Sequence, residues 1–337
     1  MIAAPLLRWY AEAKRDLPWR RTRDPWAKLV SEIMLQQTQV ATVVPYYERF
    51  IARWPTPGAF AAASEEEVLK AWEGLGYYRR ARHLHAAAKA LANKPFPRDV
   101  SALRALPGVG EYTAAAVAAI AFGARVPVVD GNVERVATRC LALPADRRAI
   151  ADRLAVEVPV DAPGDFAEAL MDLGATVCLP RNPRCDACPL AEGCVARATG
   201  SFPAPRERAK PKRVEVAALL ARREDGAVAL ERRGGDGLLA GFWTPPLAEG
   251  ETAAAAKRAL ARATGATLSR AVARHEHAFT HRRWRIRVYE GAPREGYRWA
   301  REDEWAALPL SGPAARILGE FTTRGRARGA RARDRQP

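Results

Sequence analysis

The sequence has few cysteines, methionines and acidic residues, and it lacks a long uncharged apolar run. Its 337 residues include five Cys, three Met and 38 Asp+Glu, against 54 Lys+Arg. No apolar run approaches the ~18 residues of a membrane span. The first twenty residues carry charges where a signal peptide needs its apolar core. We therefore expect a cytoplasmic, nucleoid-associated protein with no membrane among its partners.

The shortage of acidic residues leaves a formal net charge of +16 at pH 7. The last sixteen residues hold six Arg and one Asp, so the rest of the chain stays near +11. Such a charge makes a polyanion, first of all nucleic acid, the partner to consider. A general enrichment of arginine in the source organism would explain the charge equally well.

Length and composition indicate two folded domains. Apolar residues make up 48% of the chain and charged residues 27%, which excludes a disordered chain, and the length suits two domains of roughly 100–200 residues each. We expect a helical domain over 1–199, a basic, Pro-rich linker over 200–213, an α+β domain over 214–320 and a basic disordered tail over 321–337.

Hydrophobic spacing distinguishes the two domains. Apolar residues recur every three or four positions over 29–40, and residues 112–122 are so rich in Ala that they should form a closely packed helix. Beyond the linker the period becomes two, because Trp284, Ile286 and Val288 alternate with arginines. This alternation predicts a half-buried strand.

Four of the five cysteines lie within 17 residues and can surround one metal centre. They form a C-x6-C-x2-C-x5-C pattern at Cys178, Cys185, Cys188 and Cys194. Two disulfides would also fit, but nothing marks the chain as secreted, and a reducing cytosol favours metal binding. Zinc and an iron–sulfur cluster both accept four Cys, and spacing alone does not separate them. Cys140 stands apart and is expected to be a buried thiol.

Several motifs of the first domain occur in an order that resembles one enzyme superfamily. They are LPWR (17–20), SEIMLQQTQV (31–40), GLGYY (74–78), LPGVG (106–110), VDGNV (129–133) and the four-cysteine loop (178–194). Together they are similar to the endonuclease III and adenine glycosylase (MutY) superfamily of DNA repair enzymes. The resemblance implies a mainly α helix-hairpin-helix glycosylase domain with a six-helix barrel, one 4Fe–4S cluster on the four cysteines, and a monovalent cation at the hairpin.

Two carboxyl groups in these motifs suit the cleavage of a glycosidic bond. Glu32 lies on a predicted helix amid apolar neighbours, which raise the pKa of a carboxyl and keep it protonated near neutral pH. Asp130 stands just before a predicted helix, whose N-terminus favours a charged carboxylate. A neutral acid beside a charged carboxylate is suited to acid-assisted cleavage. By resemblance, Glu32 protonates N7 of adenine and Asp130 stabilises the oxocarbenium-like sugar.

Position 112 separates two branches of the superfamily. Bifunctional relatives carry a Lys there, whose amine forms a Schiff base with the sugar. This chain has Tyr112, and a phenol cannot form an imine. The resemblance therefore implies a monofunctional enzyme that removes the base without cutting the strand, with Tyr112 and Asn132 polarising the site. Glu134 departs from the family pattern, in which Lys or a neutral residue is expected.

The resemblance also assigns residues to DNA and to the excised base. Gln37 and Tyr77 correspond to side chains that wedge into the base stack when a nucleotide is extruded. The hairpin offers backbone N–H groups to a DNA phosphate; its residues are Leu106, Gly108, Val109 and Gly110. The adenine pocket corresponds to Trp19, Arg20 and Glu168.

The second domain resembles a Nudix fold without its catalytic residues. A working Nudix box, R-E-x-x-E-E-x-G, holds Mg²⁺ through carboxylates, but residues 258–265 read RALARATG. We therefore expect no pyrophosphate hydrolysis. By resemblance, this domain recognises 8-oxoguanine opposite the adenine through Phe279, Thr280 and His281, with Thr280 where the family has Ser.

Together the motifs predict a base-excision repair adenine DNA glycosylase, a monomer that acts on double-stranded DNA with adenine opposite 8-oxoguanine or guanine. Two alternatives share the scaffold. A bifunctional pyrimidine glycosylase/lyase is disfavoured by Tyr112, and a thymine–guanine mismatch glycosylase is disfavoured by the second domain. A non-enzymatic iron–sulfur DNA-binding protein would leave Glu32 and Asp130 without a role.

Overall fold

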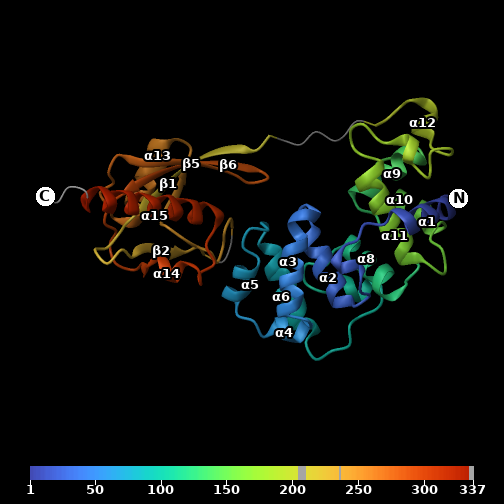
Figure 1. Ribbon diagram of the computed structural model, residues 1–337, viewed down its shortest axis with the longest axis horizontal. Helices are drawn as coiled ribbons and strands as arrows, with labels where there is room; N and C mark the ends of the chain where they lie inside the picture. Colours follow the sequence, from blue (N-terminus) through green and yellow to red (C-terminus); the bar gives the residue numbers. More distant parts are fainter. Residues whose placement is uncertain (204–209, 235–236, 334–337) are drawn as a thin grey trace. The chain divides into compact units, whose positions relative to one another are not determined.

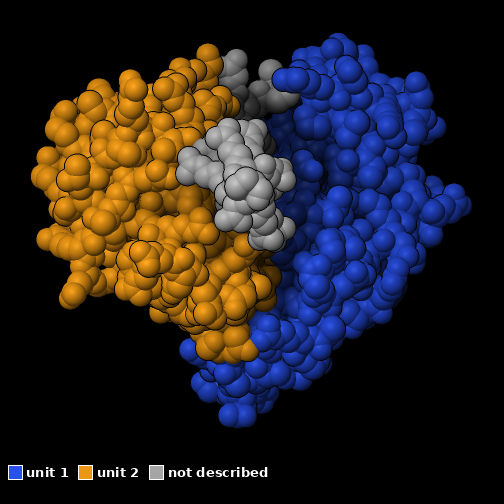
Figure 2. All heavy atoms as spheres, turned by 60° about the vertical axis from the view of Figure 1, so that its left-hand side comes forward, with its two compact units in different colours: residues 1–63, 79–207 blue, residues 64–78, 208–337 orange. Residues whose placement is uncertain are grey.

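The computed structural model describes residues 1–203, 210–234 and 237–333, with side chains up to residue 322. It consists of two compact units, one formed by residues 1–63 and 79–207 and the other by residues 64–78 and 208–337 (Figure 2). The second unit thus includes a short segment of the region that we expected to form the first domain. Part of the expected linker, residues 204–209, lies outside the described residues. Within the described ranges, no helix is long and apolar enough to cross a membrane.

The first unit is mainly α, as the sequence predicts (Figure 1). Its α-helices are α1 (Ala3–Ala13), α2 (Pro25–Leu35), α3 (Val40–Arg53), α4 (Pro57–Ala61), α6 (Arg79–Leu91), α7 (Val100–Arg104), α8 (Glu111–Phe122), α9 (Gly131–Cys140), α10 (Arg147–Ala155), α11 (Pro163–Asp172) and α12 (Val195–Thr199). Three shorter helical turns are η1 (Pro18–Arg20), η2 (Leu173–Val177) and η3 (Cys185–Ala187). Aspartates begin four of these helices, since Asp24, Asp99, Asp130 and Asp146 accept hydrogen bonds from N–H groups of the first turn.

The alanine-rich helix α8 forms where the sequence predicts it, and eight of its twelve residues are buried. Its small side chains let neighbouring helices approach closely, and α8 packs against both α2 and α11. At Gly164 of α11, an added Cβ would lie 2.9 Å from the Cα of Ile120. This packing brings the predicted acid on α2 close to Tyr112 on α8 and Glu168 on α11.

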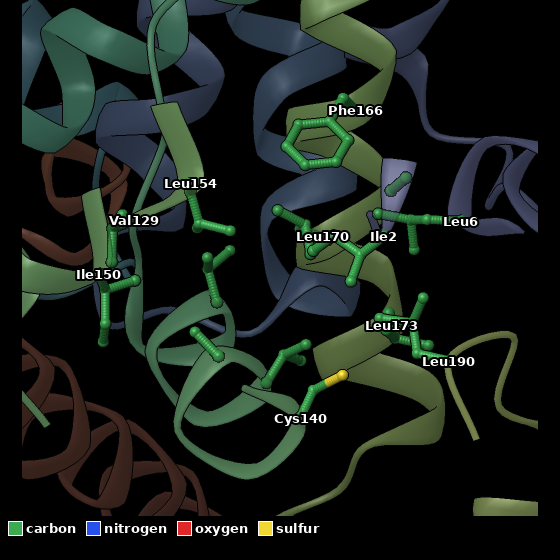
Figure 3. Packing of buried hydrophobic residues seen from close by; sticks show 14 of the residues in the cluster. Ile2, Leu6, Val129, Cys140, Ile150, Leu154, Phe166, Leu170, Leu173 and Leu190 are labelled. Carbon is green, nitrogen blue, oxygen red and sulfur yellow. The ribbon is translucent and has the colours of Figure 1, made fainter. Parts of the chain in front are cut away.

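A further core of the first unit joins α1 to α9, α10 and α11 (Figure 3). Leu6 and Leu170 are buried there, and Leu190 of the cysteine loop packs into the same cluster. Cys140 is 5% exposed, and burial raises the pKa of its thiol to about 12. The expectation of a buried thiol is therefore confirmed, and the cysteine loop is packed onto the end of α9.

The second unit is α+β, as predicted (Figure 1). Its strands are β1 (Lys212–Leu220), β2 (Val228–Arg232), β3 (Trp243–Thr244), β4 (Leu247–Gly250), β5 (Ala271–Ala278), β6 (Arg282–Glu290) and β7 (Arg298–Ala300); its helices are α5 (Glu65–Ala71), α13 (Ala253–Thr264), α14 (Glu302–Trp305) and α15 (Gly312–Arg333). One sheet has the order β4-β1-β6-β5, with β1 and β6 parallel, and the other has the order β3-β2-β7. The alternation predicted in β6 is confirmed, since Trp284, Ile286 and Val288 are at most 1% exposed.

Residues 64–78 join the second unit through apolar contacts. Ser64 caps α5, and Leu69 is fully buried in the core that contains Phe242. The ring of Tyr78 lies 4.0 Å from that of Phe242, centroid to centroid, and Lys70 Nζ donates to the carbonyl oxygen of Leu308 at 3.0 Å. The apolar face of this segment is readable from sequence, but the partner that covers it is not.

Most of the residues that we expected to form a disordered tail lie in helix α15. Helix α15 begins at Gly312 and continues to Arg333, while residues 334–337 lie outside the described residues. Ile317 and Leu318 anchor the helix in the core of the second unit. Because Ala and Arg are among the best helix formers, the helix extends beyond this anchor.

Candidate active site and iron–sulfur loop

Eight residues assigned from the sequence line one cavity of about 550 Å³ in the first unit. They are Trp19, Arg20, Glu32, Gln37, Tyr112, Asp130, Asn132 and Glu168. The cavity lies among α2, α8, α11 and the N-terminus of α9. Motifs that are distant in sequence therefore contribute to a single site.

Glu32 is the buried acid of this cavity. Its side chain accepts a hydrogen bond from the Tyr112 hydroxyl at 2.7 Å, and the residue is 6% exposed. The pKa of Glu32 is raised from 4.5 to about 7, mainly by burial and also by the charges of Asp130 and Glu168, while Tyr112 and Lys28 oppose the rise. At neutral pH a large share of Glu32 side chains therefore carries a proton.

Asp130 is held in one orientation at the start of α9. Its Oδ1 accepts from the backbone N–H groups of Asn132 at 2.8 Å and Val133 at 2.7 Å. The side-chain amide of Asn132 donates to Oδ2 at 2.9 Å. Asn132 is itself tightly packed, because a Cβ at Gly174 would lie 2.6 Å from the Cβ of Asn132. The carboxylate is therefore pre-oriented at the cavity wall by a helix N-terminus.

The predicted adenine pocket rests on buried ion pairs. Arg20 binds Asp172 with two hydrogen bonds, of 2.5 and 2.9 Å, and Arg15 pairs with the same carboxylate at 2.5 Å. Burial would raise the pKa of Asp172, but the hydrogen bonds from Arg20 and Arg15 lower it. Glu168 accepts from Lys28 Nζ at 3.2 Å and from the hydroxyl of Tyr10 at 2.8 Å.

Sequence reasoning missed four residues that shape the site: Arg15, Lys28, Arg135 and Asp172. Lys28 had a local signal, because it precedes Glu32 by four positions and helical side chains four apart share a face. Asp172 had none, since its partner Arg20 lies 152 residues away. The departure at Glu134 also has a partner, Arg147, at 3.1 Å.

The predicted hairpin joins α7 to α8 and requires glycine at position 108. Gly108 has φ +75°, and a Cβ added there would lie 2.4 Å from the Cβ of His83. Both a left-handed backbone and the space beside His83 therefore exclude larger residues. Val109 is 7% exposed and anchors the turn, and Gly110 is the N-cap of α8.

Replacing Gly108 is expected to weaken duplex binding. Gly108→Ala should bind duplex DNA at least tenfold more weakly, because the clash with His83 displaces the N–H groups of the hairpin. Gly123→Ala is the matched control: Gly123 has φ +69° but open space around it. Fluorescence anisotropy with labelled duplex would measure both, and equal affinities would contradict the role of the hairpin.

Gln37 and Tyr77, the predicted wedge residues, both have left-handed backbones, with φ of 57° and 48°. Such values are uncommon for residues with side chains and cluster at functional sites. Gln37 lines the cavity of the first unit. Tyr77 belongs to the second unit, where its hydroxyl contacts that of Thr280.

The predicted lesion loop is the turn between β5 and β6. Phe279 lies edge-on to Trp284 and to His277, with ring centroids 5.0 and 4.5 Å apart. Its backbone N–H donates to the carbonyl of Arg282 at 2.7 Å. These contacts hold Phe279 in place. The hydroxyl of Thr280 contacts that of Tyr77 in the same unit, and His281 is the last residue of the turn.

The cysteine loop is fixed by arginines of α9. Arg135 donates to the carbonyl oxygen of Cys178 at 2.8 Å. Arg139 donates to the carbonyl oxygens of Leu179 at 2.7 Å and Pro180 at 2.9 Å, and it lies 3.6 Å from the sulfur of Cys178. The helix that begins at Asp130 therefore also holds the start of the cysteine loop.

The donor set of the loop is chemically suited to an iron–sulfur cluster. Cys178, Cys185, Cys188 and Cys194 are all free thiols and half-buried. Soft thiolates hold iron–sulfur clusters and zinc ions alike, so the donor set by itself fits either group.

Comparison with known proteins agrees with this arrangement. Residues 30–159 match the HhH-GPD superfamily of base excision DNA repair proteins, residues 178–194 match the iron-sulfur binding domain of endonuclease III, and residues 217–320 match the NUDIX domain. A helix-hairpin-helix domain with a buried acid in its cavity thus defines the class as base-excision DNA glycosylases.

Curated relatives narrow the class. An adenine DNA glycosylase from Mycolicibacterium smegmatis is 52% identical over 207 residues, covering 59% of this chain and 70% of that protein. The Homo sapiens adenine DNA glycosylase is 47% identical over 213 residues, covering 57% of this chain and 38% of that protein. The chain belongs to the adenine DNA glycosylase family.

Solved structures resemble the first unit. A thermostable thymine-DNA glycosylase is 32% identical with a TM-score of 0.55, covering 58% of this chain and 95% of that chain. A non-covalent endonuclease III–DNA complex is 26% identical with a TM-score of 0.51, and the match covers 58% of this chain and 92% of that chain. These similarities confirm the helix-hairpin-helix glycosylase fold of the first unit.

Replacing one cluster ligand tests the role of the loop. Cys188→Ser is expected to lose the iron–sulfur absorbance and to bind duplex DNA more weakly, because the bound cluster would order the loop that carries Arg181 and Arg184. Cys140→Ala should keep the absorbance, since Cys140 is a buried thiol outside the ligand set. A colourless Cys188→Ser protein with unchanged affinity would contradict a structural role.

Proposed function

We propose that this adenine DNA glycosylase acts on adenine mispaired with 8-oxoguanine or guanine, and that it leaves the DNA strand uncut. One observation carries the proposal: a buried carboxyl, Glu32, shares a cavity with the oriented carboxylate of Asp130 and with a tyrosine at position 112. This pair supplies an acid for the leaving base and a negative charge for the sugar.

Glu32 and Asp130 have different roles in the proposed reaction. With its pKa near 7, Glu32 gives its proton to N7 of the extruded adenine, so that the base leaves as a neutral molecule. Asp130 faces the sugar and stabilises the positive charge that develops there. Glu32, now deprotonated, then accepts a proton from the attacking water. Trp19, Arg20 and Glu168 position the base.

The monofunctional character follows from the side chain at position 112. The Tyr112 hydroxyl donates to Glu32 and offers no amine to the sugar. The cavity does contain one amine, that of Lys28, but this group is engaged by Glu168 at 3.2 Å. The product is therefore an abasic site in an intact strand.

Further parts of the chain serve DNA recognition in this proposal. The hairpin binds a backbone phosphate together with a monovalent cation, and Gln37 and Tyr77 fill the space left by the extruded base. Phe279, Thr280 and His281 read the base opposite adenine. The enzyme works as a monomer on the chromosome. Without the Nudix glutamates, the second unit binds the lesion and hydrolyses no pyrophosphate.

The proposed cofactor is one 4Fe–4S cluster, which would be held by Cys178, Cys185, Cys188 and Cys194. When bound, it cross-links the ends of the loop through iron–thiolate bonds. Arg135 and Arg139 already fix the loop backbone. The loop itself carries Arg181 and Arg184, both exposed, and in this proposal their side chains contact DNA phosphates.

The proposal is tested with four labelled duplexes, carrying 8-oxoguanine opposite A or C, or G opposite A or T. Half of each reaction is treated with hot alkali, which cuts abasic sites. We expect cleavage of the adenine strand only after alkali. Cleavage without alkali would overturn the monofunctional assignment, and release of thymine alone would favour the activity named for the similar thymine-DNA glycosylase.

A further inference from the structure

Lys28 is a buried cation in the catalytic cavity to which the proposed mechanism gives no task. It is 3% exposed and lies on α2, one helical turn before Glu32. Its Nζ lies 3.2 Å from Oε1 of Glu168, across the cavity on α11. A buried lysine costs free energy unless it is paired, so the burial of Lys28 depends on its ion pair with Glu168.

The charged and titratable groups that line the cavity with Glu32 are Lys28 on α2, Arg15 before η1, Arg20 on η1, Tyr112 on α8, Asp130 at the N-cap of α9, Arg147 on α10 and Glu168 on α11. Arg15 is paired with Asp172 and Arg147 with Glu134. Asp130 and Glu168 bring negative charge toward the acid, and Lys28 brings positive charge. Arg20 lies 3.8 Å from Glu168, but it donates its hydrogen bonds to Asp172. Lys28 is therefore the direct counter-charge of Glu168 beside the acid.

We propose that Lys28 is a positioning residue for adenine excision: with Glu168 it forms a buried ion pair whose two opposite charges set the pH range over which Glu32 carries the proton that it donates. Lys28 touches neither the sugar nor the breaking bond in this proposal. It acts through the local field and by holding the Glu168 carboxylate toward the base. The inference rests on the proposed role of Glu32 as the acid.

The two halves of the pair act in opposite directions. Without the Lys28 charge, the carboxylates of Glu168 and Asp130 are less compensated, so Glu32 holds its proton to higher pH. Without the Glu168 charge, the ammonium of Lys28 favours the deprotonated acid, so Glu32 loses its proton at lower pH. If Lys28 or Glu168 only filled space, replacing it would not change the pH at which Glu32 loses its proton.

The test is the pH dependence of single-turnover excision from a duplex with adenine opposite 8-oxoguanine, between pH 5 and 10. The measured quantity is the pH at which the rate falls to half its plateau on the alkaline side. Lys28→Met should move this midpoint up by about one unit, and Glu168→Gln should move it down. Lys28→Arg, which keeps the charge, should leave the midpoint in place.

Each outcome decides the proposal. Midpoints that stay fixed while the plateau rates fall would overturn it, as would trapping of an imine on Lys28 with borohydride, which would make this residue a nucleophile. If Lys28→Met does not fold, the downward shift in Glu168→Gln decides alone. Failure of the proposed function looks different: wild-type protein would release no adenine, or Glu32→Gln would release it with an unchanged midpoint.

Discussion

Glu32→Gln is expected to lose adenine excision by about 10³-fold while still binding the mispaired duplex. The amide keeps the shape of the side chain. Its oxygen can still accept the hydrogen bond from the Tyr112 hydroxyl, which in the wild-type chain is 2.7 Å long. It has no proton of suitable acidity for adenine N7, so the base would have to leave as an anion. Single-turnover excision and anisotropy binding, measured on the same preparation, separate chemistry from affinity.

The matched control is Glu12→Gln, which makes the same change on the exposed side of α1. It should keep the wild-type rate. Excision by Glu32→Gln within tenfold of the wild-type rate would show that Glu32 is not the acid, and equal losses in both variants would point to a general effect of charge.

The same substitution should stabilise the fold at alkaline pH. The pKa of Glu32 lies at about 7 in the folded chain against 4.5 ordinarily, so the folded state binds the proton more tightly than the unfolded state does. Stability from this group is full below about pH 4.5 and falls as the pH rises to 7, by roughly 3 kcal/mol. Glu32→Gln should therefore raise the melting temperature at pH 8.5 but not at pH 4.5.

The residues predicted for the active site line one cavity, and each of them has a local signal in the sequence. Asp130 is an N-cap in a short loop, Glu32 lies in an apolar helix, and Tyr112 opens the alanine-rich helix behind a glycine turn. Local signals of this kind fix the position of a side chain on its own element. The packing of α8 against α2 and α11 then brings these positions into one cavity.

Contacts between distant segments could not be read in this way. Residues 64–78 show an amphipathic pattern, but burial of Leu69 against Phe242 depends on the tertiary structure. The tail was expected to be disordered from its charge, although helix propensity and the anchor at Ile317 extend α15 through it. Asp172 resembles any helix-terminal aspartate in sequence. Its role comes from two arginines more than 150 residues away.

Asp172→Asn is expected to lower the free energy of unfolding by roughly 3–5 kcal/mol, the usual cost of removing one partner from a buried ion pair. The carboxylate is fully buried and pairs with both Arg15 and Arg20. The amide removes the counter-charge that two guanidinium groups share, and Arg20, only 10% exposed, keeps only its longer ionic contact of 3.8 Å with Glu168. Urea unfolding at pH 7.5 measures the loss, and weaker excision should accompany it because Arg20 lines the cavity in which we propose that adenine binds.

The exposed pair of Asp16 and Arg21 offers a control with the same chemistry, since its oxygen and nitrogen atoms lie 2.6 Å apart. Asp16→Asn should leave the unfolding curve unchanged, because solvent already screens that pair. The pH dependence adds a second check. The pKa of Asp172 is lowered in the folded chain, so its stabilisation is present above the ordinary pKa of an aspartate and is lost as the pH falls through the lowered value. The gap between wild type and Asp172→Asn should therefore narrow in acid, and a constant gap would assign the loss to packing instead of charge.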